Sequence, residues 1–162
     1  MTGPPTDFSA LLGRLIAGQV EFILVGGLAG NVLGSARATY DIDVVYRRSP
    51  ENIARLTTVL APVRPYLRGA PAGLPFVFDV ETIRRGLNFT LTTTIGDIDL
   101  LGEVTGGGTY DNLLPMSETV PLFGGTCWCV TLDTLIRLKR AAGRPKDLEA
   151  IAELEALRDE RG

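Results

Sequence analysis

The amino-acid sequence predicts a single compact α/β domain over residues 1–162, in which a small mixed β-sheet is flanked by helices. Segments with apolar residues at helical spacing alternate with short segments typical of strands, which is the pattern of an α/β fold. A chain of 162 residues is long enough to bury the core of one domain. Apolar residues make up 45% and charged residues 22%, as in ordinary globular proteins.

The first half of the chain predicts three helices and two strands. In order, they are a helix over 8–16, a strand over 22–25, a helix from 28 to about 36, a strand over 41–46 and a helix from 50 to about 62. The first helix is amphipathic because apolar side chains recur from Phe8 to Ile16 at helical spacing. Ser49 and Pro50 favour the N-cap and first position of the last helix.

The second half predicts two strand pairs before a helical C-terminal section. In order, they are an irregular loop over 62–75, a short helix through 85, strands over 87–93 and 97–104, strands over 119–123 and 126–130, and helices from 131 to the end with a break at 143–145. Proline and glycine are frequent in the first loop, and Asp79 is a candidate cap for the short helix. Gly124-Gly125 is the expected turn of the second strand pair.

Two aspartates at the head of the second predicted strand, Asp41 and Asp43, carry the main indication of function. Side chains two residues apart on a strand point to the same face, with Cα atoms about 7 Å apart. Carboxylates so placed raise each other's pKa unless a cation lies between them. This arrangement suits a hard divalent cation with oxygen ligands, such as Mg²⁺ bound to nucleotide phosphates. The alternative, a solvated strand face, conflicts with the rarity of Asp in strands.

Two further features belong to the same predicted site. Gly26-Gly27 lies between a strand and a helix, where glycine lets backbone N–H groups approach a phosphate closely. A purely structural turn is the alternative for this glycine pair. Asp99 lies in a later predicted strand, where we expect it to meet the first two aspartates across the sheet. Asp97 shares its face but lies beside a turn, where Asp is common.

Composition excludes several classes of chemistry. The chain has no histidine, which rules out Ser-His-Asp catalysis and His-ligated metal sites. Residues 1–146 carry 14 basic and 13 acidic side chains, so the body lacks the basic surface of a protein that binds nucleic acid along its length. No apolar run approaches the roughly 20 residues that span a bilayer, and no secretory signal is evident. We therefore expect a cytoplasmic location and no membrane partner.

Together these motifs resemble the nucleotidyltransferase superfamily of the DNA polymerase β type. Gly26-Gly27, Asp41-x-Asp43 and Asp99 carry this resemblance. The stretch Arg37-Ala38-Thr39-Tyr40-Asp41-Ile42-Asp43 resembles a motif of the small bacterial branch that includes the AbiEii-type and MenT-type toxins. The segment 138–148 resembles the C-terminal motif of the same branch.

The resemblance implies a role for each matching residue. Asp41, Asp43 and Asp99 would hold Mg²⁺ or Mn²⁺, and Asp99 would accept the proton of the attacking hydroxyl. An NTP such as ATP would be the donor. The residues implied to bind it are Gly26, Gly27, Lys139 and Asp147. Arg37 is a candidate phosphate clamp because of its fork of donors. Lys139 and Lys146 are also the only two lysines among 16 basic residues, and both lie in the C-terminal motif, so Lys146 is a further candidate for binding the nucleotide.

The acceptor remains open at this point. An RNA such as tRNA, or a protein hydroxyl, fits the resemblance to toxins, which would also imply an antitoxin partner. A small molecule of the antibiotic type is the alternative acceptor. A degenerate, non-catalytic nucleotide-binding module of the same fold is the alternative from another class of protein.

Overall fold

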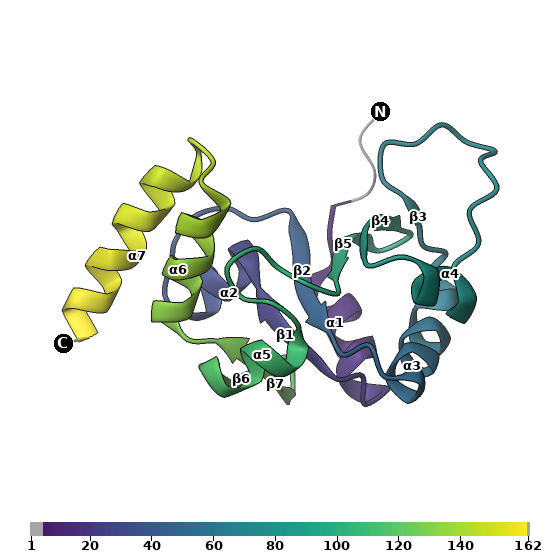
Figure 1. Ribbon diagram of the computed structural model, residues 1–162, viewed down its shortest axis with the longest axis horizontal. Coiled ribbons are helices and arrows are strands. Elements are labelled where there is room, and N and C mark those ends of the chain that lie inside the picture. The colour runs from purple at the N-terminus through teal and green to yellow at the C-terminus, as the bar shows by residue number, and fades with distance from the viewer. Residues whose placement is uncertain (1–4, 162) are drawn as a thin grey trace.

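The computed structural model describes residues 5–161, in which the strands form one seven-stranded mixed sheet (Figure 1). The strand order is β3-β4-β5-β2-β1-β7-β6. Their bounds are β1 (Phe22–Val25), β2 (Asp41–Tyr46), β3 (Tyr66–Leu67), β4 (Asn88–Thr93), β5 (Gly96–Leu101), β6 (Ser117–Leu122) and β7 (Gly125–Val130). The pairs β2–β5 and β1–β7 are parallel, and the other pairs are antiparallel. The predicted α/β class with a mixed sheet is therefore confirmed.

Helices flank the sheet in two groups. Figure 1 shows α1 (Phe8–Ala17), α3 (Pro50–Leu60) and α4 (Val80–Arg85) on one side of the molecule. On the other side lie α6 (Leu132–Ala142) and α7 (Asp147–Arg161), with α2 (Gly26–Val32) between α6 and β2. No helix within residues 5–161 has the length and apolar character needed to cross a membrane.

Local sequence signals account for the helix ends. The side chain of Asp7 accepts a hydrogen bond from Ala10 N at 2.9 Å and so begins α1. Ser49 caps α3, with Pro50 in its first turn, as predicted. Gly143, at φ +65, ends α6 in a left-handed conformation. The predicted helix break over 143–145 is therefore confirmed.

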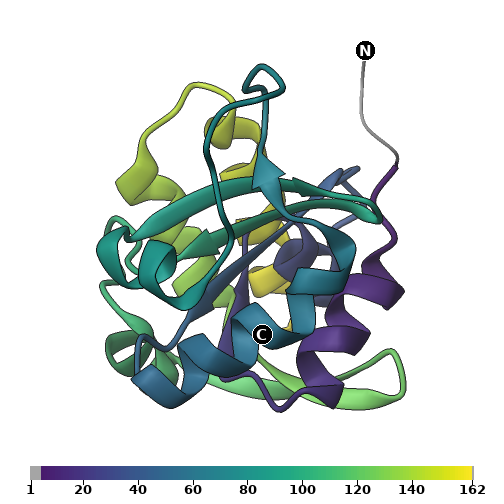
Figure 2. The same ribbon diagram turned by 90° about the vertical axis from the view of Figure 1, so that its right-hand side faces the viewer.

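Alternation along β2 and β5 separates the core from the polar face of the sheet. Ile42 and Val44 on β2, with Ile98 and Leu100 on β5, are fully buried in the hydrophobic core. Because side chains alternate along a strand, the aspartates between them point to the opposite face. Figure 2, turned by 90°, shows α1 and α3 packed alongside the sheet.

Several elements differ from their predicted bounds. Helix α2 begins at Gly26 and ends at Val32, because Gly34 adopts φ +120 and the Asn31 amide donates to Ser35 O at 3.1 Å. Strand β5 ends at Leu101 rather than at residue 104. The predicted loop 62–75 contains the end of the 3-10 helix η1 (Ala61–Val63) and the short strand β3. The elements α5 (Tyr110–Leu113) and η2 (Leu114–Met116) were not predicted.

Candidate active site

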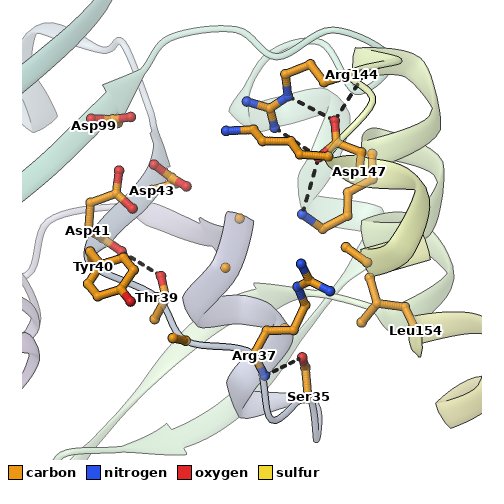
Figure 3. A pocket seen from close by; sticks show the side chains of 17 residues that line it. Ser35, Arg37, Thr39, Tyr40, Asp41, Asp43, Asp99, Arg144, Asp147 and Leu154 are labelled. Atoms are coloured by element: carbon orange, nitrogen blue, oxygen red, sulfur yellow. Dashed lines mark hydrogen bonds and ion pairs between the residues drawn. The ribbon is translucent and has the colours of Figure 1, made fainter. Parts of the chain in front are cut away.

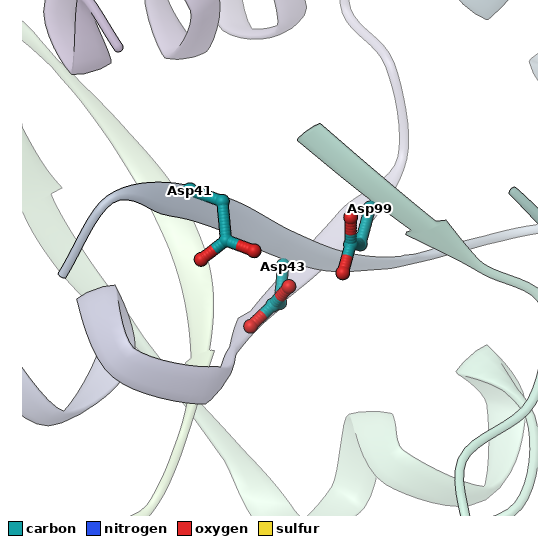
Figure 4. Close-up of side chains that lie close together, drawn as sticks. All are labelled: Asp41, Asp43 and Asp99. Atoms are coloured by element: carbon teal, nitrogen blue, oxygen red, sulfur yellow. The ribbon is translucent and has the colours of Figure 1, made fainter. Parts of the chain in front are cut away.

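Three carboxylates from two strands meet on the polar face of the sheet. The parallel register of β2 and β5 pairs Asp41 with Asp97 and Asp43 with Asp99. One carboxylate oxygen from each of Asp41, Asp43 and Asp99 lies within 4.8 Å of the others (Figure 4). The structure thus brings together the three aspartates that the sequence placed in one site.

The glycine pair permits a close approach between β2 and the start of α2. Gly26 has φ +72, and a Cβ atom built there would lie 2.8 Å from Asp43 Cγ and closer still to Oδ2. At Gly27, a Cβ atom would lie 2.7 Å from Thr39 Oγ1. Any side chain at position 26 would therefore displace the Asp43 carboxylate.

The electrostatics of the three aspartates favour a bound cation. Burial, followed by the charges of Asp41 and Asp99, raises the pKa of Asp43 to about 8. Burial and the Asp99 charge also raise the pKa of Asp41. Three carboxylate oxygens at this spacing fit a hard divalent cation such as Mg²⁺ or Mn²⁺, which would lower both pKa values by supplying positive charge.

A cationic wall faces the aspartates across a cavity. Lys139 on α6 lies 4.0 Å from Asp147 Oδ1, and Arg144 Nε lies 2.9 Å from Asp147 Oδ2. Asp147 is only 3% exposed, so its carboxylate holds the two basic side chains at the junction of α6 and α7. Burial lowers the pKa of Lys139, although the Asp147 charge opposes this shift. Figure 3 shows Arg144 and Asp147 opposite the aspartates.

The cavity between the two walls has a volume of about 410 Å³ and is open to solvent. Arg37 extends toward it from the segment after α2, and its Nη1 pairs with Glu153 Oε1 at 3.1 Å. All nine predicted site residues line this cavity: Gly26, Gly27, Arg37, Asp41, Asp43, Asp99, Lys139, Lys146 and Asp147.

Two basic residues of the site were not among the predicted ones. Arg144 lies in the C-terminal motif and pairs with Asp147. Arg68, directly after β3, places its guanidinium among the aspartates, with Nη2 2.7 Å from Asp99 Oδ1. Strand β3 has only two residues and lies between Pro65 and Gly69, which is too short for a two-residue period, so no local signal in the sequence identified Arg68.

A second cavity, of about 430 Å³, also borders Asp43 and Asp99. It shares Gly26, Asp43, Asp99, Lys139 and Arg144 with the first cavity. Its other walls combine apolar side chains with a few polar ones: Val25, Leu101, Val104, Leu135, Leu138 and Ala142, with Asn88, Glu103 and Thr105. Asp43 and Asp99 therefore border both cavities.

Comparison with solved structures confirms that the helices and the mixed sheet form a nucleotidyltransferase-like fold. The chain is similar to the lincosamide antibiotic adenylyltransferase LnuA in its lincomycin-bound crystal structure, with a TM-score of 0.60 and 14% identity over 95% of this chain and 99% of that one. It is also similar to the antibiotic-resistance factor ANT(2'')-Ia in solution, with a TM-score of 0.52 and 15% identity over 93% of this chain and 86% of that one. A crystal structure of ANT(2'')-Ia with adenylyl-2''-tobramycin gives the same TM-score and identity over 96% and 97%. No protein-family model and no curated protein sequence matches the chain.

Proposed function

We propose that this protein is a nucleotidyltransferase that transfers a nucleoside monophosphate from an NTP to a hydroxyl group of a small molecule. The observation that carries the proposal is the meeting of two cavities at Asp43 and Asp99. One cavity has opposed acidic and basic walls, which suit a metal-bound triphosphate. The other offers space for the acceptor beside the same carboxylates.

The nucleotide binds in the first cavity in this proposal. Asp41, Asp43 and Asp99 hold Mg²⁺ or Mn²⁺, which when bound neutralises phosphate charge and polarises phosphoryl oxygens. The basic side chains of the opposite wall, namely Arg37, Lys139, Arg144 and Lys146, face the phosphates. The bare backbone at Gly26 and Gly27 allows the triphosphate to approach the sheet closely.

The reaction is an in-line displacement at the α-phosphorus. The acceptor oxygen forms a bond to that phosphorus, the bond to the β-phosphate oxygen breaks, and pyrophosphate leaves. Asp99 accepts the proton of the acceptor hydroxyl, because it borders the second cavity as well as the first. The basic side chains of the opposite wall stabilise the negative charge that develops on the leaving pyrophosphate.

The shape and charge of the second cavity favour a small acceptor. Its volume falls within the range of small-molecule sites. Apart from Lys139 and Arg144, which it shares with the first cavity, this cavity is lined by no basic residue within residues 5–161, and its apolar side chains and the exposed carboxylate of Glu103 do not match the phosphate backbone of an RNA. The similar structures support this choice over the RNA or protein acceptors of a toxin, because lincomycin is bound in one of them and an adenylylated tobramycin in another.

A transfer assay tests the proposal. The protein is incubated with each α-labelled NTP, Mg²⁺ or Mn²⁺, and one acceptor at a time: lincomycin, tobramycin, total tRNA or protein extract. We expect pyrophosphate release and a labelled product with a small molecule, and an activity loss of at least about 100-fold in Asp43→Asn. Asp159→Asn, on the exposed end of α7, is the matched control and retains full activity.

Each other outcome identifies the part of the proposal that is wrong. Labelling of tRNA or protein, with the small molecules unlabelled, contradicts the acceptor class. Equal transfer by Asp43→Asn and wild type contradicts the assigned site. NTP binding measured by calorimetry, without pyrophosphate release for any acceptor, favours the non-catalytic module.

A further inference from the structure

Arg68 occupies a fixed place at the end of the polar row that contains the catalytic aspartates. Its backbone N–H donates to Thr90 O at 3.0 Å, which extends the pairing of β3 with β4 by one residue. Thr90 pairs with Asp99, and Asp99 pairs with Asp43. Residues in register on neighbouring strands point to the same face, so Arg68 lies on the face of the aspartates.

The guanidinium of Arg68 contacts three carboxylates at once. Nη2 lies 2.7 Å from Asp99 Oδ1, Nε lies 3.3 Å from Asp97 Oδ2, and Nη1 lies 3.6 Å from Asp41 Oδ2. Nη2 also donates to Leu91 O at 2.7 Å, which anchors the side chain to β4. The side chain is 27% exposed, so these contacts are partly shielded from water.

Negative charges outnumber positive ones on the face of the sheet that carries the aspartates. Asp41, Asp43, Asp97 and Asp99 carry four carboxylates, and Arg68 is the only basic residue within residues 5–161 that forms an ion pair with any of them. Lys139 of the opposite wall pairs with Asp147 instead. Arg68 thus offsets the repulsion that the pairing of β2 with β5 creates.

We propose that Arg68 is a positioning residue that acts as the resident counter-ion of the aspartate cluster and lowers the affinity of the site for free divalent cations. Two of its partners, Asp41 and Asp99, are proposed metal ligands, so Arg68 and the cation share carboxylates. Its positive charge also repels the cation directly. The inference rests on the metal site of the proposed function, but not on transfer to an acceptor.

Opposite effects on stability and metal affinity distinguish this role from a merely structural one. Without Arg68, the carboxylates repel one another, so Arg68→Met lowers the unfolding temperature in EDTA. The same change removes the competing charge, so Mn²⁺ binds at least about tenfold more tightly. Arg68→Gln, which keeps a hydrogen-bond donor but no charge, tightens Mn²⁺ binding in the same direction.

The experiment is a Mn²⁺ titration of the full chain without nucleotide. Binding is measured by calorimetry and by the electron paramagnetic resonance signal of free Mn²⁺. Arg64→Met is the control, because Arg64 is exposed and forms no ion pair in the described part of the chain. It leaves Mn²⁺ affinity unchanged. Asp43→Asn tests the metal site itself and weakens Mn²⁺ binding.

Two failures have different meanings. If Asp43→Asn binds Mn²⁺ as wild type does, the metal site of the proposed function is wrong. If Asp43→Asn weakens binding but folded Arg68→Met and Arg68→Gln bind Mn²⁺ no more tightly than wild type, the counter-ion role of Arg68 is refuted. Should Arg68→Met not fold, Arg68→Gln alone decides the outcome.

Discussion

Substitution of Gly26 by alanine tests the close approach on which the site depends. Gly26 has φ +72, and a new Cβ atom would lie 2.8 Å from Asp43 Cγ. Carbon atoms in contact are normally 3.5–4.0 Å apart, so the Asp43 carboxylate has to move by roughly 1 Å. The left-handed backbone conformation costs alanine about 1–2 kcal/mol, and the forced contact about 1–3 kcal/mol more.

A matched glycine separates these two costs. Gly124, in the turn between β6 and β7, has φ +79, and no atom lies within 4 Å of the position that a Cβ atom would take there. Gly124→Ala therefore carries the backbone cost alone, about 1–2 kcal/mol in urea unfolding. Gly26→Ala should lose about 2–5 kcal/mol, a large part of the 5–15 kcal/mol that stabilises a typical domain.

Transfer activity and Mn²⁺ affinity should likewise be lower in Gly26→Ala than in Gly124→Ala. If Asp43 is a metal ligand, as proposed, its displacement by about 1 Å should lower transfer by roughly 100-fold. Mn²⁺ affinity should fall in Gly26→Ala and stay at the wild-type value in Gly124→Ala. If Gly26→Ala loses no more stability than Gly124→Ala and binds Mn²⁺ normally, Gly26 does not hold Asp43 in place and the site geometry is wrong.

Two further predictions concern the carboxylates of Asp43 and Asp147. The pKa of Asp43 is about 8 in the folded protein and about 4 in the unfolded chain, so the folded state binds the extra proton between these values. In EDTA, stability against urea should therefore fall as pH rises from about 4 to about 8. Asp43→Asn should remove most of this pH dependence. If the stability of Asp43→Asn depends on pH as steeply as that of wild type, the dependence comes from another group. Asp147→Asn leaves Lys139 and Arg144 without their buried partner and should lower stability by about 1–3 kcal/mol and raise the KM for the NTP that the transfer assay identifies as donor. Equal KM values for this variant and wild type would show that the basic wall does not depend on Asp147.

The part of the site that the sequence predicts is the part with local signals. Asp41 and Asp43 share a face because of the two-residue period of a strand, and Asp99 follows the same rule on β5. The pair Gly26-Gly27 after a strand marks the turn into α2, which begins at Gly26. These signals are enough for the α/β class and for the acidic cluster.

Long-range contacts account for what the sequence did not predict. Strand β3 has two residues and is stabilised by its pairing with β4, so a local pattern between Pro65 and Gly69 reads as a loop. The end of α2 depends on Asn31, whose amide bonds to the chain beyond it at Ser35 and Arg37. The position of Arg68 among the aspartates follows from both strand pairings together.

The parallel pairing of β2 with β5 explains why the basic residues lie where they do. It aligns Asp41 with Asp97 and Asp43 with Asp99, which concentrates four carboxylates on one face. A sheet does not tolerate such a row without opposite charge. Arg68 supplies that charge on the same face of the sheet, and it forms an ion pair with each of the four except Asp43. The pKa of Asp43 is raised to about 8, and no basic side chain in the described part of the chain pairs with its carboxylate. The carboxylate is therefore free to bind a cation in the cavity between the sheet and the basic wall of α6 and α7.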